Sequence, residues 1–573
     1  MKQFQRINLI LTSENIGKLI VFFILMLFTV VFETLGIALI LPAITFVIDS
    51  DLKTNSQFLN DILNYFTENF DRTYLLKIVF VLILITFLIK NIILIIFLWW
   101  NKRFVEHLYR EICLKLLNVE LQKSYLDHIN TSSALVVRNF NEVKAFLKYL
   151  ENFVILFVES AILILIVGIL LLIEYKVTLS VGALLIFLVV IFRAFTNKLI
   201  KNYGEARFFR SGEMMKTLID ILNNYKNIKI FNKSDFFTEK FKKDNFIYSN
   251  VNKKFQIIDN LPRFWLEIAG VLGLCSIVYF LLFLGYGPKS ILPILGVFTV
   301  AFFRMIPSVL RIVRSLQAIR FDSPVTDQLF ISLKDLKPYK KNLQQTDLNF
   351  SNTIQIKNLS FQYPNKERKI LKKLNFEIKK GERIGIKGET GVGKSTLIDL
   401  LLGFLTPTEG QILIDNKNIH FNLNKWRSLI GYVPQKINVI NGTIKDNILF
   451  GSTDYSEEIQ NKKLQDSINI SEFEQVIAGL KNGLDTIVGD KGLDLSGGQL
   501  QRLAFARALF KDPDILILDE STNALDLEIE KKLFNNLIKN KNEKTIIMIS
   551  HNLETLKFCN SVFELKDSTL KNL

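Results

Sequence analysis

Cysteine is scarce in this sequence, and its scarcity argues against two kinds of protein. The three cysteines, Cys113, Cys275 and Cys559, lie far apart among 573 residues. A disulfide framework needs several cysteine pairs, and a zinc site needs ligands at short, regular spacings. Neither pattern is present in the sequence, so we expect neither a disulfide-stapled fold nor a zinc centre.

A single basic patch is also lacking, although Lys and Arg (71) outnumber Asp and Glu (55) and give a net charge of +16. Such an excess is typical of proteins that bind nucleic acid or an anionic membrane surface. Here the basic residues flank apolar segments instead of forming one cluster. We therefore expect membrane lipids as partners and no nucleic acid.

Apolar sequence is abundant. Hydrophobic residues make up 49% of the chain and the mean hydropathy is +0.26, yet 22% of the residues are charged. A chain of this length is too long for one core. We predict an α-helical six-span transmembrane domain over residues 1–320, with cytoplasmic helical extensions. A linker that contains Pro324 and Pro338 follows over residues 321–351, and a soluble α/β domain occupies residues 352–573.

Six apolar segments are long enough to cross a bilayer, which takes about 20 residues of helix. Two long loops between them, 101–152 and 197–260, are rich in Lys and Arg, which predicts that these loops and both termini are cytoplasmic. Residues 49–73 carry apolar side chains at helical spacing and predict a short helix, either on the outer membrane surface or packed on the protein. The six segments are residues 18–48, 75–100, 153–173, 177–196, 264–284 and 291–311.

The strongest motif is a glycine-rich loop between an apolar strand, residues 383–386, and a helix, residues 397–402. It fits G-x-x-x-x-G-K-[ST], in which backbone N–H groups turn inward around phosphate oxygens. We expect Lys394 to reach the outer phosphates of ATP and the Ser395 hydroxyl to ligate Mg²⁺. The motif consists of Gly388, Glu389, Thr390, Gly391, Val392, Gly393, Lys394, Ser395 and Thr396.

Two acids follow a second apolar strand, residues 515–518. Asp519 is a candidate ligand for Mg²⁺, and Glu520 is a candidate for orienting or deprotonating the attacking water. Between the two motifs, a Ser-Gly-Gly-Gln turn opens a helix and predicts a second phosphate cradle. Two cradles in one domain indicate that nucleotide is held between two copies of the chain. The turn consists of Ser496, Gly497, Gly498 and Gln499.

These motifs occur in the order found in ABC transporters, and residues 352–573 resemble the nucleotide-binding domain of that family. The resemblance implies that Tyr363 stacks on adenine, that Gln435 contacts Mg²⁺ and faces the membrane domain, and that His551 contacts the γ-phosphate. It also implies that Asp526 lies in a loop that crosses a dimer interface, and that the cofactors are ATP and Mg²⁺. Taken singly, these residues also have purely structural interpretations, in the core, a turn or a helix cap.

The sequence departs from the family pattern at three places. Asn523 stands where Ser is usual, and Asp490 and Lys491 replace a Glu and an Arg in the loop before the Ser-Gly-Gly turn. These changes leave Glu520 and His551 intact, so we predict an ATP-hydrolysing site rather than a degenerate one. Only contacts that couple the two domains are affected.

Six spans ahead of one such domain resemble the exporter half-transporters, which work as dimers. The resemblance implies that cytoplasmic helices near residues 123–129 and 214–227 dock on the nucleotide-binding domains. Because one chain carries a complete set of catalytic motifs, we predict a homodimer. A heterodimer with a degenerate partner stays open.

Arginines in the membrane domain are candidates for substrate binding. Arg304, Arg311 and Arg314 are seven and three residues apart, and therefore lie on one helical face. Guanidinium groups bind phosphate oxygens through paired hydrogen bonds, so this face suits a diphosphate head group. Arg263 is a further candidate. The alternative is that Arg311 and Arg314 lie beyond the bilayer, on the cytoplasmic extension of the helix, and pair with acids of the protein.

Three stretches resemble the lipid-linked oligosaccharide flippases of the PglK type: residues 33–42, 262–267 and 303–308. The resemblance implies ATP-driven transfer of a polyprenyl-diphosphate-linked oligosaccharide from the cytoplasmic to the periplasmic leaflet of the bacterial inner membrane. Alternatives of similar architecture are a lipid A or a multidrug exporter. An alternative of a different class is an ATP-gated channel or a regulatory nucleotide-binding module.

Overall fold

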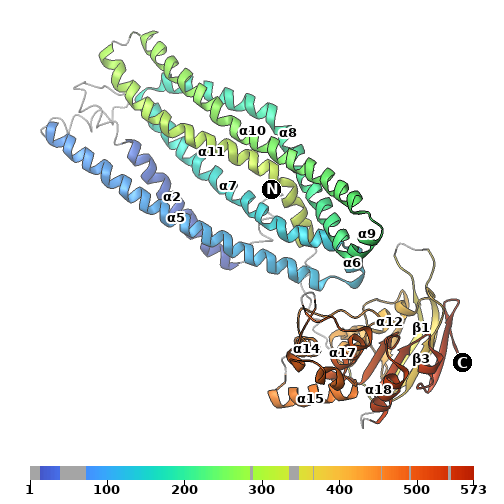
Figure 1. Cartoon of the computed structure of the whole chain (residues 1–573). Coiled ribbons are helices and arrows are strands. Elements are labelled where there is room, and N and C mark those ends of the chain that lie inside the picture. Colours follow the sequence, from blue (N-terminus) through green and yellow to red (C-terminus); the bar gives the residue numbers. More distant parts are fainter. Residues whose placement is uncertain are drawn as a thin grey trace. The chain divides into compact units, whose positions relative to one another are not determined.

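The computed structural model describes most of the chain as two units (Figure 1). One comprises residues 1–123 and 128–339, and the other comprises residues 124–127 and 340–573. The described residues are 13–38, 72–283, 285, 288–334, 347–364, 367–452, 455–489, 492–539 and 544–573. The short helix predicted over residues 49–73 and the end of the first apolar segment lie outside them.

The first unit consists mainly of long helices, and the described part of each of the six predicted apolar segments lies in one of them. Four helices are long and apolar enough to cross a membrane within the described residues: Lys77–Gln122, Ser133–Leu172, Ser234–Phe283 and Leu295–Leu333. The helices of this unit are α2 (Ser13–Ala38), α5 (Arg72–Gln122), α7 (Ser133–Ile173), α8 (Tyr175–Asn223), α9 (Tyr225–Ile230), α10 (Ser234–Phe283) and α11 (Pro288–Lys334), and the short helix α6 (Tyr125–Asn130) is divided between the two units.

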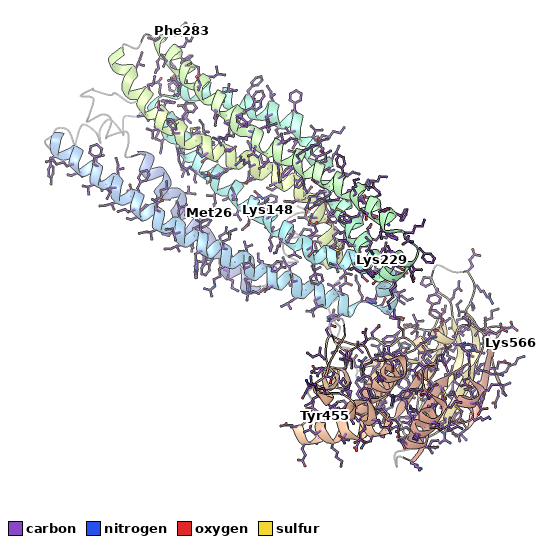
Figure 2. The ribbon with its side chains drawn as sticks, viewed as in Figure 1. Met26, Lys148, Lys229, Phe283, Tyr455 and Lys566 are labelled. Carbon is purple, nitrogen blue, oxygen red and sulfur yellow. The ribbon has the colours of Figure 1, made fainter. Side chains whose placement is uncertain are left out.

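These helices are much longer than a bilayer is thick. A helix of 50 residues such as α10 spans about 75 Å, whereas the hydrocarbon layer is about 30 Å thick. The excess length confirms that the helices extend beyond their apolar segments, as the polar loop sequences indicate. Helix α7 packs against α11, and α8 packs against α10. Met26 is buried in this bundle, whereas Phe283 is 77% exposed (Figure 2).

Helix α11 continues to Lys334, beyond residue 320, where the sequence predicted a linker to begin. Proline removes one backbone donor and commonly ends a helix, but here Pro324 lies inside one. Packing outweighs that loss, because Phe321, Val325 and Leu329 around the proline are all buried. The described helix therefore takes up the first part of the predicted linker.

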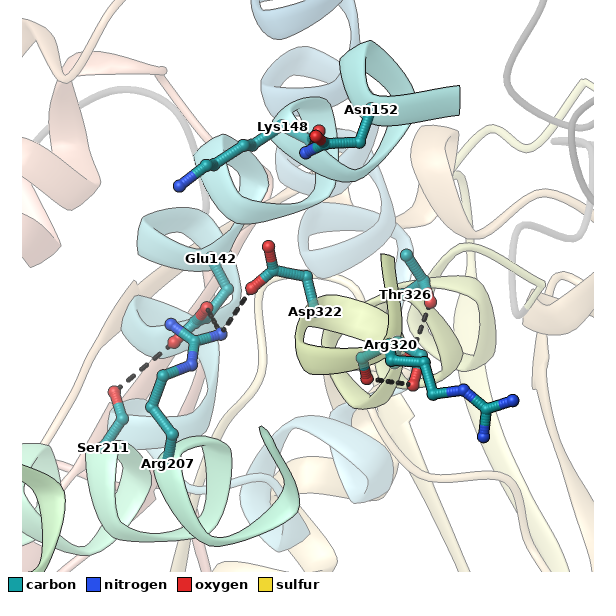
Figure 3. A network of polar contacts seen from close by, with 9 residues as sticks. Glu142, Lys148, Asn152, Arg207, Ser211, Arg320, Asp322 and Thr326 are labelled. Carbon is teal, nitrogen blue, oxygen red and sulfur yellow. Dashed lines mark hydrogen bonds and ion pairs between the residues drawn. The ribbon is translucent and has the colours of Figure 1, made fainter. Parts of the chain in front are cut away.

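A buried group of charges joins three helices of this unit (Figure 3). Arg207 on α8 donates from Nη2 to Glu142 Oε2 on α7 at 3.2 Å and to Asp322 Oδ1 on α11 at 3.4 Å. All three side chains are at most 12% exposed. Ser211, one turn after Arg207, donates to the other oxygen of Glu142 at 3.5 Å. One guanidinium is thus the shared partner of two buried carboxylates.

The second unit is built on two larger sheets and one two-stranded sheet. An antiparallel sheet has the order β2 (Leu371–Lys379), β1 (Thr353–Phe361), β4 (Glu409–Ile414), β5 (Lys417–Asn418). The six-stranded sheet has the order β12 (Thr569–Asn572), β11 (Ser561–Lys566), β3 (Arg383–Lys387), β10 (Thr545–Ile549), β9 (Ile515–Asp519), β6 (Ile430–Val433), and all its strands except β12 are parallel. The small sheet pairs β7 (Gly442–Thr443) with β8 (Ile487–Val488).

Helices cover the sheets and complete the core of this unit. The fully buried side chains of this core include Trp426, Phe505, Phe510 and Phe534. The helices are α12 (Lys394–Leu401), α13 (Leu423–Ser428), α14 (Ile444–Leu449), α15 (Glu457–Ile470), α16 (Glu474–Ala478), α17 (Gly497–Phe510), α18 (Leu527–Lys539) and α19 (Leu553–Leu556), with short 3-10 turns at Ile419–Phe421 and Gly483–Asp485.

The sheet order places the predicted motifs at one edge. Strands β3, β10 and β9 are neighbours, are parallel and are almost wholly buried. The carboxyl ends of parallel strands meet at the same edge of a sheet, where ligands of α/β proteins bind. The glycine-rich loop follows β3, the two acids close β9, and His551 follows β10.

We predict that Arg207→Met destabilises the protein strongly, because it leaves Glu142 and Asp322 buried without their shared cation. Breaking a buried charge pair costs about 3–5 kcal/mol. The measurement is the thermal unfolding temperature of the full-length protein in detergent. Lys242→Met is the matched control, since the Lys242–Glu239 pair is about 70% exposed and contributes little. Equal unfolding temperatures for the two variants would contradict the prediction.

Candidate nucleotide site

The glycine-rich loop connects β3 to α12, as the motif requires. Gly391 and Gly393 have φ angles of +84° and +114°, which side-chain-bearing residues rarely adopt. Gly393 caps the start of α12, and a Cβ atom there would lie only 2.8 Å from Cγ2 of Ile370. Backbone conformation and close packing together therefore require glycine at this position.

Lys394 lies at the centre of the site. Its ammonium donates to the carbonyl oxygen of Gly388 at 2.7 Å, lies 2.5 Å from His551 Nε2 and is 3.7 Å from Glu520 Oε1. The residue is only 7% exposed, and burial lowers the pKa of its ammonium, while Glu520 acts in the opposite direction. A buried cation beside a glycine-rich loop suits the phosphate chain of a nucleotide.

Three further residues contact Glu520. Its φ angle is +46°, an uncommon conformation for a residue with a side chain, and its N–H donates to the carbonyl oxygen of Ile549 at 2.9 Å. Gln435 Nε2 donates to Glu520 Oε2 at 2.6 Å, and His551 Nε2 lies 3.1 Å from Oε1. The structure thus brings together all three predicted catalytic residues. Backbone strain of this kind clusters at functional sites.

The predicted magnesium ligands offer only oxygen donors. Asp519 contributes a carboxylate, Ser395 an exposed hydroxyl and Gln435 an amide oxygen. Such hard donors, together with nucleotide phosphates, fit Mg²⁺. The described residues contain no group of three His, Cys, Asp or Glu that would suit another metal. Burial and Glu520 raise the pKa of Asp519, while a hydrogen bond from Tyr432 lowers it.

Tyr363 lies beside the glycine-rich loop. Its hydroxyl is 3.4 Å from Oγ1 of Thr396, and its ring meets the ring of Phe361 edge to face at 5.0 Å. The side chain is half-buried rather than part of the closed core. This position is compatible with contact to a bound nucleotide, and stacking on adenine stays a prediction.

The Ser-Gly-Gly-Gln turn opens α17 with a reciprocal cap. The N–H of Gln499 donates to Ser496 Oγ at 3.3 Å, and the N–H of Ser496 donates to Gln499 Oε1 at 2.8 Å. A Cβ atom at Gly498 would lie 2.8 Å from the carbonyl oxygen of Ala524, so the turn packs closely on residues 523–526. Ser496, Gly497 and Asp526 are exposed. Their contact with nucleotide on a second copy stays a prediction, and Asp490 and Lys491 lie outside the described residues.

Three of the four candidate substrate arginines are paired with acids. Arg311 Nε lies 2.6 Å from Glu159 Oε1, and its Nη2 lies 3.3 Å from Oε2, so the guanidinium engages both carboxylate oxygens. Arg314 Nε lies 3.9 Å from Asp259 Oδ2, and Arg263 pairs with Glu267 one turn away at 3.0 Å. Pairing with acids, the alternative that the sequence left open for Arg311 and Arg314, is therefore observed at both of them. Arg304 lies two turns before Arg311 on α11 and is half-buried.

Two residues of the site were not singled out in the sequence. Tyr432, within the stretch that contains Gln435, donates its hydroxyl to Asp519 Oδ2 at 3.5 Å. Asp399 is an acid inside the first helix after the loop, and burial together with Asp519 raises its pKa to about 6. The sequence feature that could have indicated Asp399 is a single acid within the apolar stretch 397–402. No feature of the sequence indicated Tyr432.

The fold and the site together define a protein with long membrane-spanning helices and a P-loop nucleotide-binding domain. The family described as "ABC transporter" matches residues 371–523, and the family described as "ABC transporter transmembrane region" matches residues 53–306. An ABC transporter transmembrane region is therefore matched in the first half of the chain, and an ABC transporter domain with the nucleotide motifs is matched in the second half.

Similar proteins agree with this assignment. The chain is 29% identical to the ATP-dependent lipid A-core flippase of Pasteurella multocida over 66% of this chain and 64% of that protein. It is 29% identical to the flippase of the same name from Haemophilus influenzae, over 68% and 66%. It is 37% identical to the mitochondrial iron-sulfur clusters transporter ATM1 of Candida glabrata, over 40% and 31%. The matched stretches thus span less than two thirds of these relatives.

A solved structure supports the fold over nearly the whole chain. A bacterial Atm1-family ABC exporter with ATP bound superposes with a TM-score of 0.78 at 22% identity, and covers 95% of this chain and 94% of that one. Helical spans followed by a nucleotide-binding domain are thus shared along both chains. The similarities confirm an ABC exporter fold but do not include a flippase of the PglK type among these relatives.

We predict that Asp399→Asn stabilises the protein at pH 7.5. The folded-state pKa of about 6 lies above the ordinary value near 4, so the folded state binds the extra proton and loses stability as pH rises from about 4 to about 6. Asn removes this loss. Because Asp399 is partly exposed, solvent screening reduces the gain to about 1 kcal/mol.

Thermal unfolding of the metal-free protein in EDTA measures this effect. The gain at pH 7.5 should shrink at pH 5.0, and Asp466→Asn, an exposed acid on α15, should change neither value. A gain of the same size at both pH values would contradict the assignment to ionised Asp399.

Proposed function

We propose that the chain is one half of a homodimeric, ATP-hydrolysing exporter that moves a phosphorylated glycolipid across a bacterial inner membrane. The observation that carries the ATPase part is the convergence of Lys394, Gln435, Glu520 and His551 at one sheet edge. These are the groups needed to hold phosphate, orient water and respond to the γ-phosphate. A module that only binds nucleotide has no need for Glu520 in this position.

In this proposal the residues of the site have separate tasks. The glycine-rich loop and Lys394 hold the phosphates, and Tyr363 contacts the base. Bound Mg²⁺ neutralises charge on the phosphates, and Ser395, Asp519 and Gln435 would hold it. Glu520 accepts a proton from, or orients, the attacking water. Ser496 and Asp526 are exposed, as a contact with the second copy requires.

Two classes of glycolipid are candidates for the substrate in this proposal. A polyprenyl-diphosphate-linked oligosaccharide is supported by the membrane-domain stretches around Glu33, Arg263 and Arg304. A lipid A-core glycolipid is supported by the two flippases of that name, whose likeness extends over about two thirds of this chain. Both lipids combine phosphate groups with sugars and apolar chains, so Arg304 suits either head group. Arg304 lies two turns deeper in the apolar segment than Arg311 and is therefore the better candidate of the two.

We predict that Glu520→Gln lowers ATP hydrolysis by at least about 100-fold, the usual contribution of a general base, and leaves ATP binding intact. The purified full-length protein in liposomes is the sample, with phosphate release and ATP binding as separate readouts. Glu528→Gln, an exposed acid on α18, is the matched control and should hydrolyse normally. Steady hydrolysis by the Glu520→Gln protein would overturn the role of Glu520.

We predict that a phosphorylated glycolipid stimulates ATP hydrolysis in liposomes and that Arg304→Ala loses this stimulation with basal hydrolysis unchanged. A polyprenyl-diphosphate oligosaccharide and a lipid A-core preparation are tested side by side, and the lipid that stimulates identifies the substrate class. Arg320→Ala, on the same helix but beyond the predicted apolar segment, should respond as the wild type. Stimulation by hydrophobic drugs alone would move the substrate to the multidrug exporters.

A further inference from the structure

We propose that Tyr432 is a positioning residue whose hydroxyl orients the Asp519 carboxylate toward the magnesium ion of bound ATP. The inference rests on the proposed function, because it concerns the metal of the same site. It assigns a task to a residue that belongs to neither the P-loop nor the pair of acids.

The sheet places the two residues together. Strand β6 lies directly beside β9 and runs parallel to it, with Tyr432 opposite Ile517. Side chains two residues apart on a strand point to the same face, so Tyr432 shares a face with Asp519 at the end of the neighbouring strand. The tyrosine hydroxyl is 3.5 Å from Asp519 Oδ2. Backbone register, which a substitution at Tyr432 leaves in place, therefore determines this contact.

The charges around Asp519 explain why a donor is useful there. Glu520 follows it in the chain, and Asp399 on α12 is close enough to feel the charge of Asp519. Like charges at this distance repel one another, so the Asp519 carboxylate needs partners that hold it in place. Lys394 attracts it, but that ammonium already contacts Gly388 and His551. Tyr432 adds a directional hydrogen bond to one carboxylate oxygen.

Tyr432 is suited to act only as a donor. A phenol has an ordinary pKa near 10, so the hydroxyl keeps its proton at physiological pH and can donate to the carboxylate. A neutral hydroxyl that holds Oδ2 leaves the other carboxylate oxygen to face a metal ion. Groups that orient a metal ligand in this way typically contribute about 10- to 100-fold to metal affinity.

The test separates metal binding from nucleotide binding. In the full-length Glu520→Gln protein, which holds ATP without turnover, the affinity for Mn²⁺ at saturating ATP is measured by electron paramagnetic resonance. Tyr432→Phe should weaken Mn²⁺ binding by about 10-fold, because phenylalanine keeps the ring but loses the hydroxyl. The affinity for ATP in EDTA should stay unchanged. Tyr455→Phe, which removes another hydroxyl in the same unit, should change neither value.

A second readout uses the hydrolysing protein. With Glu520 intact, Tyr432→Phe should raise the Mg²⁺ concentration for half-maximal hydrolysis by a similar factor, with the rate at saturating Mg²⁺ much less affected. Unchanged metal affinity, or an equal loss of ATP affinity in EDTA, would overturn the positioning role and leave the proposed ATPase standing. No hydrolysis by the wild-type protein would overturn the proposed function, whereas the Mn²⁺ measurement would still test Tyr432.

Discussion

Burial of three neighbouring parallel strands is the constraint on which the nucleotide site depends. Strands β3, β9 and β10 are apolar and nearly inaccessible, so their polar continuations can only emerge where the strands end. That edge receives the glycine-rich loop, Asp519 with Glu520, and His551 from segments up to 163 residues apart in the chain, from Gly388 to His551. The catalytic geometry is thus a consequence of how the hydrophobic core is closed.

The same logic of burial governs charge in the helical unit. Arg207 contacts two buried carboxylates from different helices, and Arg311 contacts Glu159 with two of its three nitrogens. Such an arginine links two or more helices of the protein, and its charge is already paired with a carboxylate. An anionic substrate that binds this unit must therefore either contact other cationic side chains or displace a carboxylate from one of these arginine pairs.

The nucleotide-binding half and the membrane half of the chain differ in how strictly their sequence motifs specify a function. The nucleotide motifs specify chemistry residue by residue, because each phosphate or metal contact needs one kind of side chain. The membrane stretches around Arg263 and Arg304 contain far fewer such requirements, since many sequences are apolar enough to span a bilayer. The two family matches therefore cover an ABC transporter domain in each half of the chain, whereas the flippases that the chain resembles bear the name of lipid A-core rather than of oligosaccharide carriers.

The sequence alone determined the helical spans, the strand–loop–helix around Lys394 and the carboxylates after β9, because each follows from local periodicity or from a short motif. The continuation of α11 through Pro324 could not be foreseen, since the packing of Phe321 and Leu329 outweighs the local preference of proline. Only the tertiary structure decided that Arg311 pairs with Glu159 and that Tyr432 and Asp399 lie near Asp519. These contacts join residues far apart in the chain, and their partners are selected by packing and sheet register, which leave no local pattern.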